Sequence, residues 1–162
     1  MKVLFILMSL LFATKDNPIG NSDAIVGVWQ NGTGKGHIQI FKQDGKYHGK
    51  IIWLREPLDK QTGRPKVDTK NPIPSNRNNP ILGLVMMRNF RYDEGEWNGG
   101  QIYVPSEGKE YKAYIKMVDE NTLSVRGYIG IALIGKTDTW TRVGCSPFIF
   151  ISSLKIPVIN LH

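Results

Sequence analysis

The stretch GHIQIFKQDGKYHGKIIWL, residues 36–54, decides the fold. Its Asp44-Gly45 pair is a strong signal for a two-residue hairpin turn, because a type I′ turn needs a positive φ angle at both positions. A turn there sets Ile38 opposite Ile51, so the register from the turn agrees with the register from the hydrophobic pattern. The buried face of this predicted hairpin holds Ile38, Ile40, Ile51 and Trp53.

Residues 111–129 predict a second hairpin by the same reasoning. Asp119-Glu120-Asn121 is expected to form a three-residue loop, with Asn121 in the left-handed conformation. Apolar and polar side chains then alternate on both strands, which is typical of an antiparallel sheet with one buried and one solvated face. The buried face is predicted to hold four opposed pairs: Tyr111 with Ile129, Ala113 with Gly127, Ile115 with Val125, and Met117 with Leu123.

Turn signals divide the rest of the chain into short strands. Asn98-Gly99-Gly100 is predicted to turn into a strand over Gln101–Val104, and Pro105–Gly108 to end that strand. Residues 56–80 are rich in proline and lack apolar periodicity, which predicts a long loop. The apolar runs number about eight, without helical crossovers, so the simplest fold is all-β, an antiparallel up-and-down β-barrel. An open sandwich is the alternative.

Two short motifs near the ends of this β-rich region predict how the barrel closes. Gly27-Val28-Trp29 stands near its start, and Arg142 ends the Thr139–Arg142 segment. A closed barrel brings its first and last strands side by side. We therefore expect the Arg142 guanidinium within about 6 Å of the Trp29 ring, as a cation–π pair that closes the barrel.

The N-terminus predicts export. Lys2 precedes an apolar run over Val3–Phe12 that is too short to span a bilayer and suits a secretory signal. The predicted organisation is a signal peptide over residues 1–20, a barrel domain over 21–145 and a tail over 146–162. The alternatives for the first segment are an uncleaved anchor and a buried first strand. Cys145 is the only cysteine, which excludes an intramolecular disulfide and fits a bacterial periplasmic or secreted protein.

The charge of the chain is strongly basic. The net charge is +7 and the sequence pI about 9.5, with Lys and Arg scattered along the chain. We find no nucleic-acid-binding motif, so no nucleic-acid partner is expected. The excess of basic residues is either an ordinary solvated surface or a means of attraction to envelope lipid or cell-wall polymer. No membrane-spanning segment is expected after the signal is removed.

Several fragments in fixed order carry a family resemblance. The chain resembles a bacterial family of exported, functionally uncharacterised proteins with a lipocalin-like barrel, over about residues 24–143. Val104 and Ile73 depart from it, because acidic residues are expected at those positions in relatives. The matching fragments are Gly27-Val28-Trp29, residues 44–51, Asp68-Thr69-Lys70-Asn71-Pro72, Gly83-Leu84, Trp97, residues 100–105, Val125-Arg126-Gly127-Tyr128-Ile129-Gly130, Leu133, Gly135, Thr137 and Trp140-Thr141-Arg142.

The resemblance implies a cup for a small hydrophobic or amphipathic ligand. A barrel filled by its own side chains is the alternative, since small eight-stranded barrels occur in both forms. Gly49 and Gly127 are both predicted to face inward and to leave space, which favours a cavity. The predicted ligand-binding interior is Ile38, Ile40, Ile51, Trp53, Tyr111, Ile115, Met117, Val125 and Ile129.

Catalytic patterns are weak, and we assign no catalytic residue, cofactor or metal. Asp68, Asn71 and Arg77 are candidates for a polar loop site, although Asx residues in proline-rich loops commonly bond local backbone. Three function classes remain: a periplasmic carrier of a small lipophilic molecule, which we favour, an envelope interaction module, and an enzyme acting inside the cup. A cavity of several hundred Å³ would favour the first.

Overall fold

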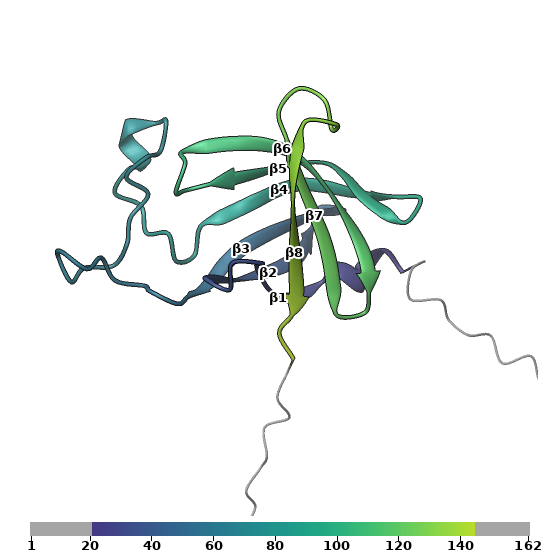
Figure 1. Ribbon diagram of the computed structural model, residues 1–162, viewed down its shortest axis with the longest axis horizontal. Coiled ribbons are helices and arrows are strands. Elements are labelled where there is room, and N and C mark those ends of the chain that lie inside the picture. Colours follow the sequence, from purple (N-terminus) through teal and green to yellow (C-terminus); the bar gives the residue numbers. More distant parts are fainter. Residues whose placement is uncertain (1–20, 145–162) are drawn as a thin grey trace, which may run out of the picture.

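The computed structural model describes residues 21–144, whose strands form one closed antiparallel barrel in the order β1 to β8 (Figure 1). Each strand pairs with its neighbours in the chain, and β1 also pairs with β8. This confirms the predicted barrel and excludes the open sandwich. The predicted signal peptide (residues 1–20) and tail (residues 146–162), together with Cys145, lie outside the described residues. The strands are β1 (Gly27–Gln30), β2 (Gly36–Gln43), β3 (Lys46–Leu54), β4 (Val85–Asp93), β5 (Glu96–Val104), β6 (Lys109–Asp119), β7 (Thr122–Tyr128) and β8 (Gly135–Arg142).

The register of the β2–β3 hairpin follows the sequence pattern. Asp44 and Gly45 have φ angles of 50° and 70°, as a type I′ turn requires. Ile38 pairs with Ile51, and Ile40 with Gly49. The β6–β7 hairpin likewise has the predicted pairs as far as Ala113 and Gly127.

Two predicted inward residues do not lie on the buried faces of their hairpins. The β2–β3 register shifts between His37 and Ile38, so Trp53 pairs with His37 instead of sharing the face of Ile51. Trp53 is 39% exposed and its ring stacks on His37, with 4.2 Å between centroids. Strand β7 ends at Tyr128, so Ile129 has no pairing with Tyr111 and is 63% exposed. The prediction that these two side chains share the buried face of their hairpins is wrong.

Two predicted turns are also wrong. The β6–β7 loop is shorter than expected, because Asp119 pairs with Thr122 and a register shift between Met117 and Asp119 takes up the extra residue. Asn121 does not have the expected positive φ angle. The β4–β5 turn lies at Glu94-Gly95, and the expected turn at Asn98-Gly99-Gly100 is instead an irregularity inside β5.

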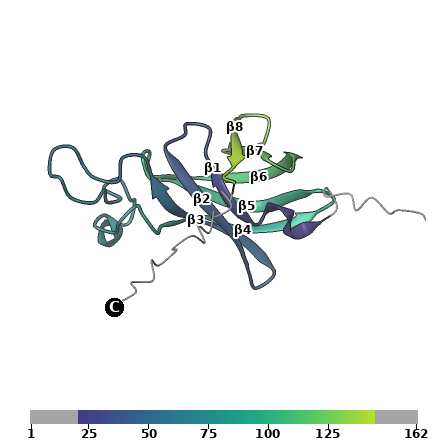
Figure 2. The same ribbon diagram turned by 90° about the horizontal axis from the view of Figure 1, so that it is seen from below.

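The predicted long loop connects β3 to β4. It projects from one side of the barrel (Figures 1 and 2) and contains the short 3₁₀ helix η3 (Pro74–Asn76). Two isolated bridges, Leu58 with Pro65 and Val67 with Pro80, give it internal structure. The turns β4–β5 and β6–β7 lie on the opposite side of the barrel in Figure 1.

One end of the barrel is plugged by the 3₁₀ helix η2 (Ser22–Ile25), and we name it the closed end. The Trp29 indole N–H donates to the carbonyl of Ile25 at 2.8 Å, and the Trp97 indole N–H to that of Ser22 at 3.0 Å. The Asp23 carboxylate accepts the Tyr47 hydroxyl at 2.6 Å and the Lys42 ammonium at 2.7 Å. These two donors hold the pKa of Asp23 below its usual value.

Arg142 joins the first and last strands at this closed end. It pairs with Trp29 across the β1–β8 ladder, and its guanidinium carbon lies 4.0 Å from the centroid of the Trp29 ring, inside the expected distance. Its N–H groups donate to the carbonyls of Ala24 at 2.7 Å, Glu120 at 2.8 Å and Val26 at 3.2 Å. Burial lowers the pKa of Arg142 from its ordinary value.

The hydrophobic core fills the part of the barrel next to η2. Its buried members come from every strand, so no strand is held by backbone pairing alone. They are Ile25, Trp29, Ile38, Ile40, Tyr47, Met87, Phe90, Trp97, Ile102, Ala113, Ile115, Leu123, Val125 and Trp140.

Candidate functional site

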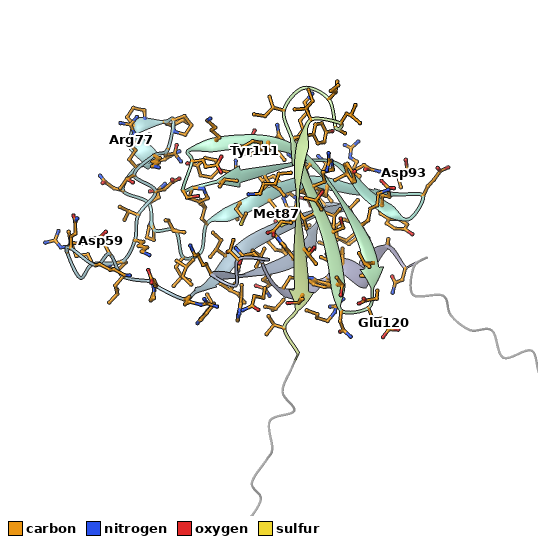
Figure 3. The ribbon with its side chains drawn as sticks, in the orientation of Figure 1. Asp59, Arg77, Met87, Asp93, Tyr111 and Glu120 are labelled. Atoms are coloured by element: carbon orange, nitrogen blue, oxygen red, sulfur yellow. The ribbon has the colours of Figure 1, made fainter. Side chains whose placement is uncertain are left out.

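A cavity of about 980 Å³ opens at the other end of the barrel, which we name the open end. Four loops surround it: β1–β2, the long loop β3–β4, β5–β6 and β7–β8. In Figure 3 the labelled Asp59 and Arg77 mark the long loop, while Asp93 and Glu120 mark the turns of the closed end. The wall is mainly apolar and includes Ile38, Ile51, Leu54, Ile81, Met86, Ile102, Val104, Tyr111, Val125, Gly127, Ile129, Ile134 and Trp140.

The residues predicted to line the interior separate into three groups. The first group lines the cavity: Ile38, Ile51, Tyr111, Val125 and Ile129. The second group, Ile40, Ile115 and Met117, packs within or against the core and is not part of the cavity wall. Trp53 alone forms the third group, outside the barrel. Ile129 therefore contacts the cavity from the loop at its mouth and not from the buried face of β7.

The two glycines that were expected to leave space do not behave alike. A Cβ atom at Gly49 would lie 2.6 Å from the sulfur of Met87, so the Met87 side chain already occupies that space. A Cβ atom at Gly127 would lie 3.6 Å from the Cβ of Tyr111, which is ordinary contact. Gly127 lines the cavity, and Gly49 belongs to the packed core. The barrel is therefore filled by side chains toward its closed end and hollow toward its open end.

Sequence reasoning missed seven of the wall residues: Leu54, Ile81, Met86, Ile102, Val104, Ile134 and Trp140. For Trp140, Ile102 and Val104 the strand pattern contained the signal. Trp140 stands two residues before Arg142, and side chains two apart in a strand share a face. An inward Arg142 therefore already implied an inward Trp140. The same alternation in the predicted Gln101–Val104 strand places Ile102 and Val104 together.

A few polar groups are embedded in the wall. The Trp140 indole N–H donates to the Asp138 carboxylate at 2.8 Å, and the Gly32 backbone N–H donates to the same oxygen at 3.3 Å. The Tyr111 hydroxyl donates to the Glu107 carboxylate, and this hydrogen bond raises the pKa of Tyr111. Each of these two wall carboxylates thus has a donor within the protein.

The mouth of the cavity carries more free cations than free anions. Glu56, the third carboxylate of the lining, pairs with Lys66 at 3.5 Å and with Lys60 at 3.2 Å. Within residues 21–144, no ion pair or side-chain hydrogen bond engages the other three lining cations. These exposed cations are Lys35, Arg55 and Lys136.

The three loop candidates lie together, but they hold the loop instead of lining the cavity. Asp68 is 1% exposed, and its carboxylate accepts the Tyr103 hydroxyl at 2.8 Å and the Asn71 amide at 2.6 Å. The Arg77 guanidinium donates to the backbone carbonyl of Asn71 at 2.9 Å. Burial and the Asp68 hydrogen bond raise the pKa of Tyr103 to about 12. The cluster fixes the long loop to the outer face of β5.

Two other kinds of site are absent from the described residues. Between residues 21 and 144, no three His, Cys, Asp or Glu side chains gather as a metal site would require. The same part of the chain contains no helix with the length and apolar character needed to cross a membrane.

Comparison with known proteins identifies a matching family and a similar fold. The family model described as "Uncharacterized protein conserved in bacteria (DUF2147)" matches residues 27–142. Among solved structures, protein HP1028 from Helicobacter pylori, described as belonging to the lipocalin family, matches with a TM-score of 0.62 and 22% sequence identity. The match covers 74% of this chain and 83% of that one. At this identity the likeness shows a shared fold. No curated protein matches the chain.

Proposed function

The chain belongs to DUF2147, a family of uncharacterised bacterial proteins, and we propose that it binds a small hydrophobic or amphipathic molecule in the open end of its barrel. The proposal rests on the apolar cavity of about 980 Å³ at the open end, next to the packed hydrophobic core. Ligand pockets commonly have volumes of about 300–1,000 Å³ and mainly apolar walls with a few fixed polar groups. The wall carboxylates Asp138 and Glu107 are polar groups of that kind.

The charges at the mouth support an amphiphile whose polar end is anionic. An apolar chain would occupy the wall between Ile38, Val125 and Trp140, with its head group at the level of Lys35, Arg55 and Lys136. The three carboxylates of the lining are already engaged by donors of the protein, so they oppose an anion less than free carboxylates would.

We further propose that the protein works in the periplasm or outside the cell. Support comes from Lys2 and the apolar run Val3–Phe12, the pattern of a secretory signal. Sequencing the N-terminus of protein isolated from the host envelope should give a start at roughly residues 14–24. A mature protein that begins at Met1 and fractionates with the cytosol would contradict this assignment.

The ligand proposal is tested first by native mass spectrometry of protein isolated from its host. We expect a non-covalent adduct with the mass of a lipid-like molecule, released on unfolding. Dodecanol, a neutral amphiphile, then tests the site in purified protein after the adduct has been removed. The retained mass identifies the ligand class, and the alcohol tests the cavity without relying on charge.

Tryptophan fluorescence tests whether dodecanol binds inside the cavity. Trp140 is part of the cavity wall, whereas Trp53 lies outside the barrel against His37. Dodecanol should change the emission of the wild type and of Trp53→Phe, and the change should be lost in Trp140→Phe. Loss of the change in Trp53→Phe with retention in Trp140→Phe would place binding outside the barrel. Absence of binding by calorimetry would contradict the proposal itself.

A further inference from the structure

The loop between β7 and β8 exposes an unusual group of large aliphatic side chains. Within six residues, Ile129 is 63%, Ile131 61%, Leu133 86% and Ile134 71% exposed. In Figure 1 this loop rises clear of the barrel. Single exposed aliphatic residues are ordinary, but a contiguous group of them marks a surface for binding a partner or a membrane.

The fold holds this loop in its raised position. The Arg126 guanidinium donates to the carbonyls of Ala132 at 2.9 Å and Leu133 at 3.2 Å, and to the Thr137 hydroxyl at 2.9 Å. A further backbone hydrogen bond joins the N–H of Ile134 to the carbonyl of Ile131 at 3.1 Å. The polar groups of the loop therefore bond inward while its aliphatic side chains point to solvent. The Arg126 side chain therefore holds the β7–β8 loop in place and does not cover its aliphatic side chains.

Basic side chains flank the aliphatic group. Lys136 is the second residue of β8, just after the loop, and Lys112 shares a surface depression with Ile129 and Gly130. Glu110 lies in the same depression, and the Arg126 guanidinium adds a third positive charge beneath the loop. Apolar tips beside cations are the arrangement with which proteins enter the head-group region of an anionic bilayer.

We infer that the β7–β8 loop docks the protein on an anionic lipid surface, with Ile131, Leu133 and Ile134 inserted among the lipids. The charge of the protein favours this occupant over a second copy of the chain, because docking two copies would bring two basic surfaces together, and the net charge is +7. Ile129 and Ile134 also line the mouth of the cavity, so docking would bring that mouth to the lipid surface. The inference does not depend on the identity of any ligand.

Vesicle flotation tests the inference with mature protein isolated from its host. Vesicles of phosphatidylglycerol should bind the wild type, and the double variant Leu133→Ser with Ile134→Ser should bind at least tenfold more weakly. Val118→Ser is the matched control, because Val118 is also an aliphatic residue, 62% exposed, but lies in the irregular segment before the β6–β7 turn at the closed end. It should bind as the wild type does. Equal losses in the two variants would overturn the inference.

A site-specific probe separates docking by this loop from binding by any other segment. In a Cys145→Ser background, Leu133→Cys or Val118→Cys is labelled with an environment-sensitive nitrobenzoxadiazole dye. Phosphatidylglycerol vesicles should shift the emission to shorter wavelength at position 133 and not at position 118. No shift at position 133, or equal shifts at both positions, would overturn the inference.

Two further measurements test the choice of occupant. Phosphatidylcholine vesicles should bind at least threefold more weakly, and raising the salt from 0.1 to 0.5 M should reduce the difference between the two lipids. Equal binding to both lipids at low salt would overturn the assignment of an anionic surface. If Leu133→Ser with Ile134→Ser instead converts a dimer to a monomer without affecting flotation, the loop is a self-association surface and the inference is wrong.

Discussion

The two ends of the barrel are built from the same eight strands but by different means. At the closed end, Trp29, Trp97 and Arg142 are fixed by hydrogen bonds to the segment around η2, and the interior is filled. At the open end, the aliphatic and aromatic wall surrounds empty space, and several charged side chains have no partner in the described structure. Under the proposed function, the closed end provides stability and the open end binds the ligand.

The largest effect should come from Arg142→Met at the closed end. The substitution removes the cation over Trp29 and the donors to the carbonyls of Ala24, Val26 and Glu120. We expect the free energy of unfolding in urea to fall by about 2–4 kcal/mol, since hydrogen bonds from charged donors are individually strong. Arg55→Met at the open end removes an exposed arginine that makes no such hydrogen bonds. It should change the free energy of unfolding by less than about 0.5 kcal/mol.

A double-mutant cycle with Trp29→Leu isolates the ring contact from the hydrogen bonds. Residues in contact give non-additive losses, and we expect a coupling energy of about 0.5–2 kcal/mol between Trp29 and Arg142. Strict additivity would show that the guanidinium stabilises the closed end through the backbone carbonyls alone.

The next effect compares two glycines on the inner face of the barrel. Gly49→Leu forces a side chain against Met87 and Ile38, so it should lower the free energy of unfolding by about 1–3 kcal/mol. Gly127→Leu points into the cavity and should cost less than about 1 kcal/mol, since room is present. The affinity for dodecanol should show the opposite order: Gly127→Leu should weaken binding more than Gly49→Leu does.

Ser124→Leu controls for added bulk on the same strand as Gly127. Ser124 pairs with Lys116 and Thr139 on the outer face of the barrel and is not part of the cavity wall. It should leave dodecanol binding unchanged. Equal stability losses for the two glycine variants would mean that the barrel is not divided into filled and hollow parts.

How far the sequence predicts these two ends depends on the kind of information that each needs. The β2–β3 register was predictable because Asp44-Gly45 and the alternation of apolar residues are both local. Trp53 was misplaced because the register shift between His37 and Ile38 interrupts an alternation that the apolar pattern continues. Ile129 was misplaced because its apolar character continues the alternation past the point where β7 ends.

Part of the cavity wall was predictable for a similar reason. Alternation identified Ile38, Ile51, Tyr111 and Val125, because inward-facing positions follow from the strand pattern. Whether the interior at a given height is filled depends on side chains that approach from other strands. Met87 fills the space at Gly49, and nothing in the residues around Gly49 reveals this. The proportion of filled to hollow barrel is therefore a property of the packing.

A smaller effect concerns how the long loop is held at the open end. Tyr103→Phe removes a donor to the buried Asp68 carboxylate and should lower the free energy of unfolding by about 1–2 kcal/mol at pH 7. The pKa of Tyr103 is about 12 in the folded protein, against 10.0 ordinarily. Because the folded pKa is the higher, this stabilisation is fully present below pH 10 and is lost as the pH rises to about 12. The stability difference between wild type and Tyr103→Phe should shrink over that interval.

Urea unfolding of both proteins between pH 8 and pH 12 measures this difference directly. Other tyrosines and the lysines titrate in the same interval, but they are common to both proteins and cancel in the comparison. A difference that stays constant up to pH 12 would show that the Tyr103–Asp68 hydrogen bond does not hold the loop.

The smallest effect separates charge from apolar contact at the mouth of the cavity. Dodecanoate and dodecanol share one alkyl chain and differ in the charge of the head group. If Arg55 and Lys136 attract an anionic head, then Arg55→Met and Lys136→Met should each weaken dodecanoate about threefold, roughly 0.6 kcal/mol, as for exposed ion pairs. Dodecanol should be unaffected, and Arg91→Met, an exposed arginine near the closed end, should alter neither ligand. Calorimetric titration measures all of these affinities. Equal losses of affinity for dodecanol and dodecanoate would mean that the mouth acts through shape alone. A loss of dodecanoate affinity in Arg91→Met would mean that only the total charge of the protein matters.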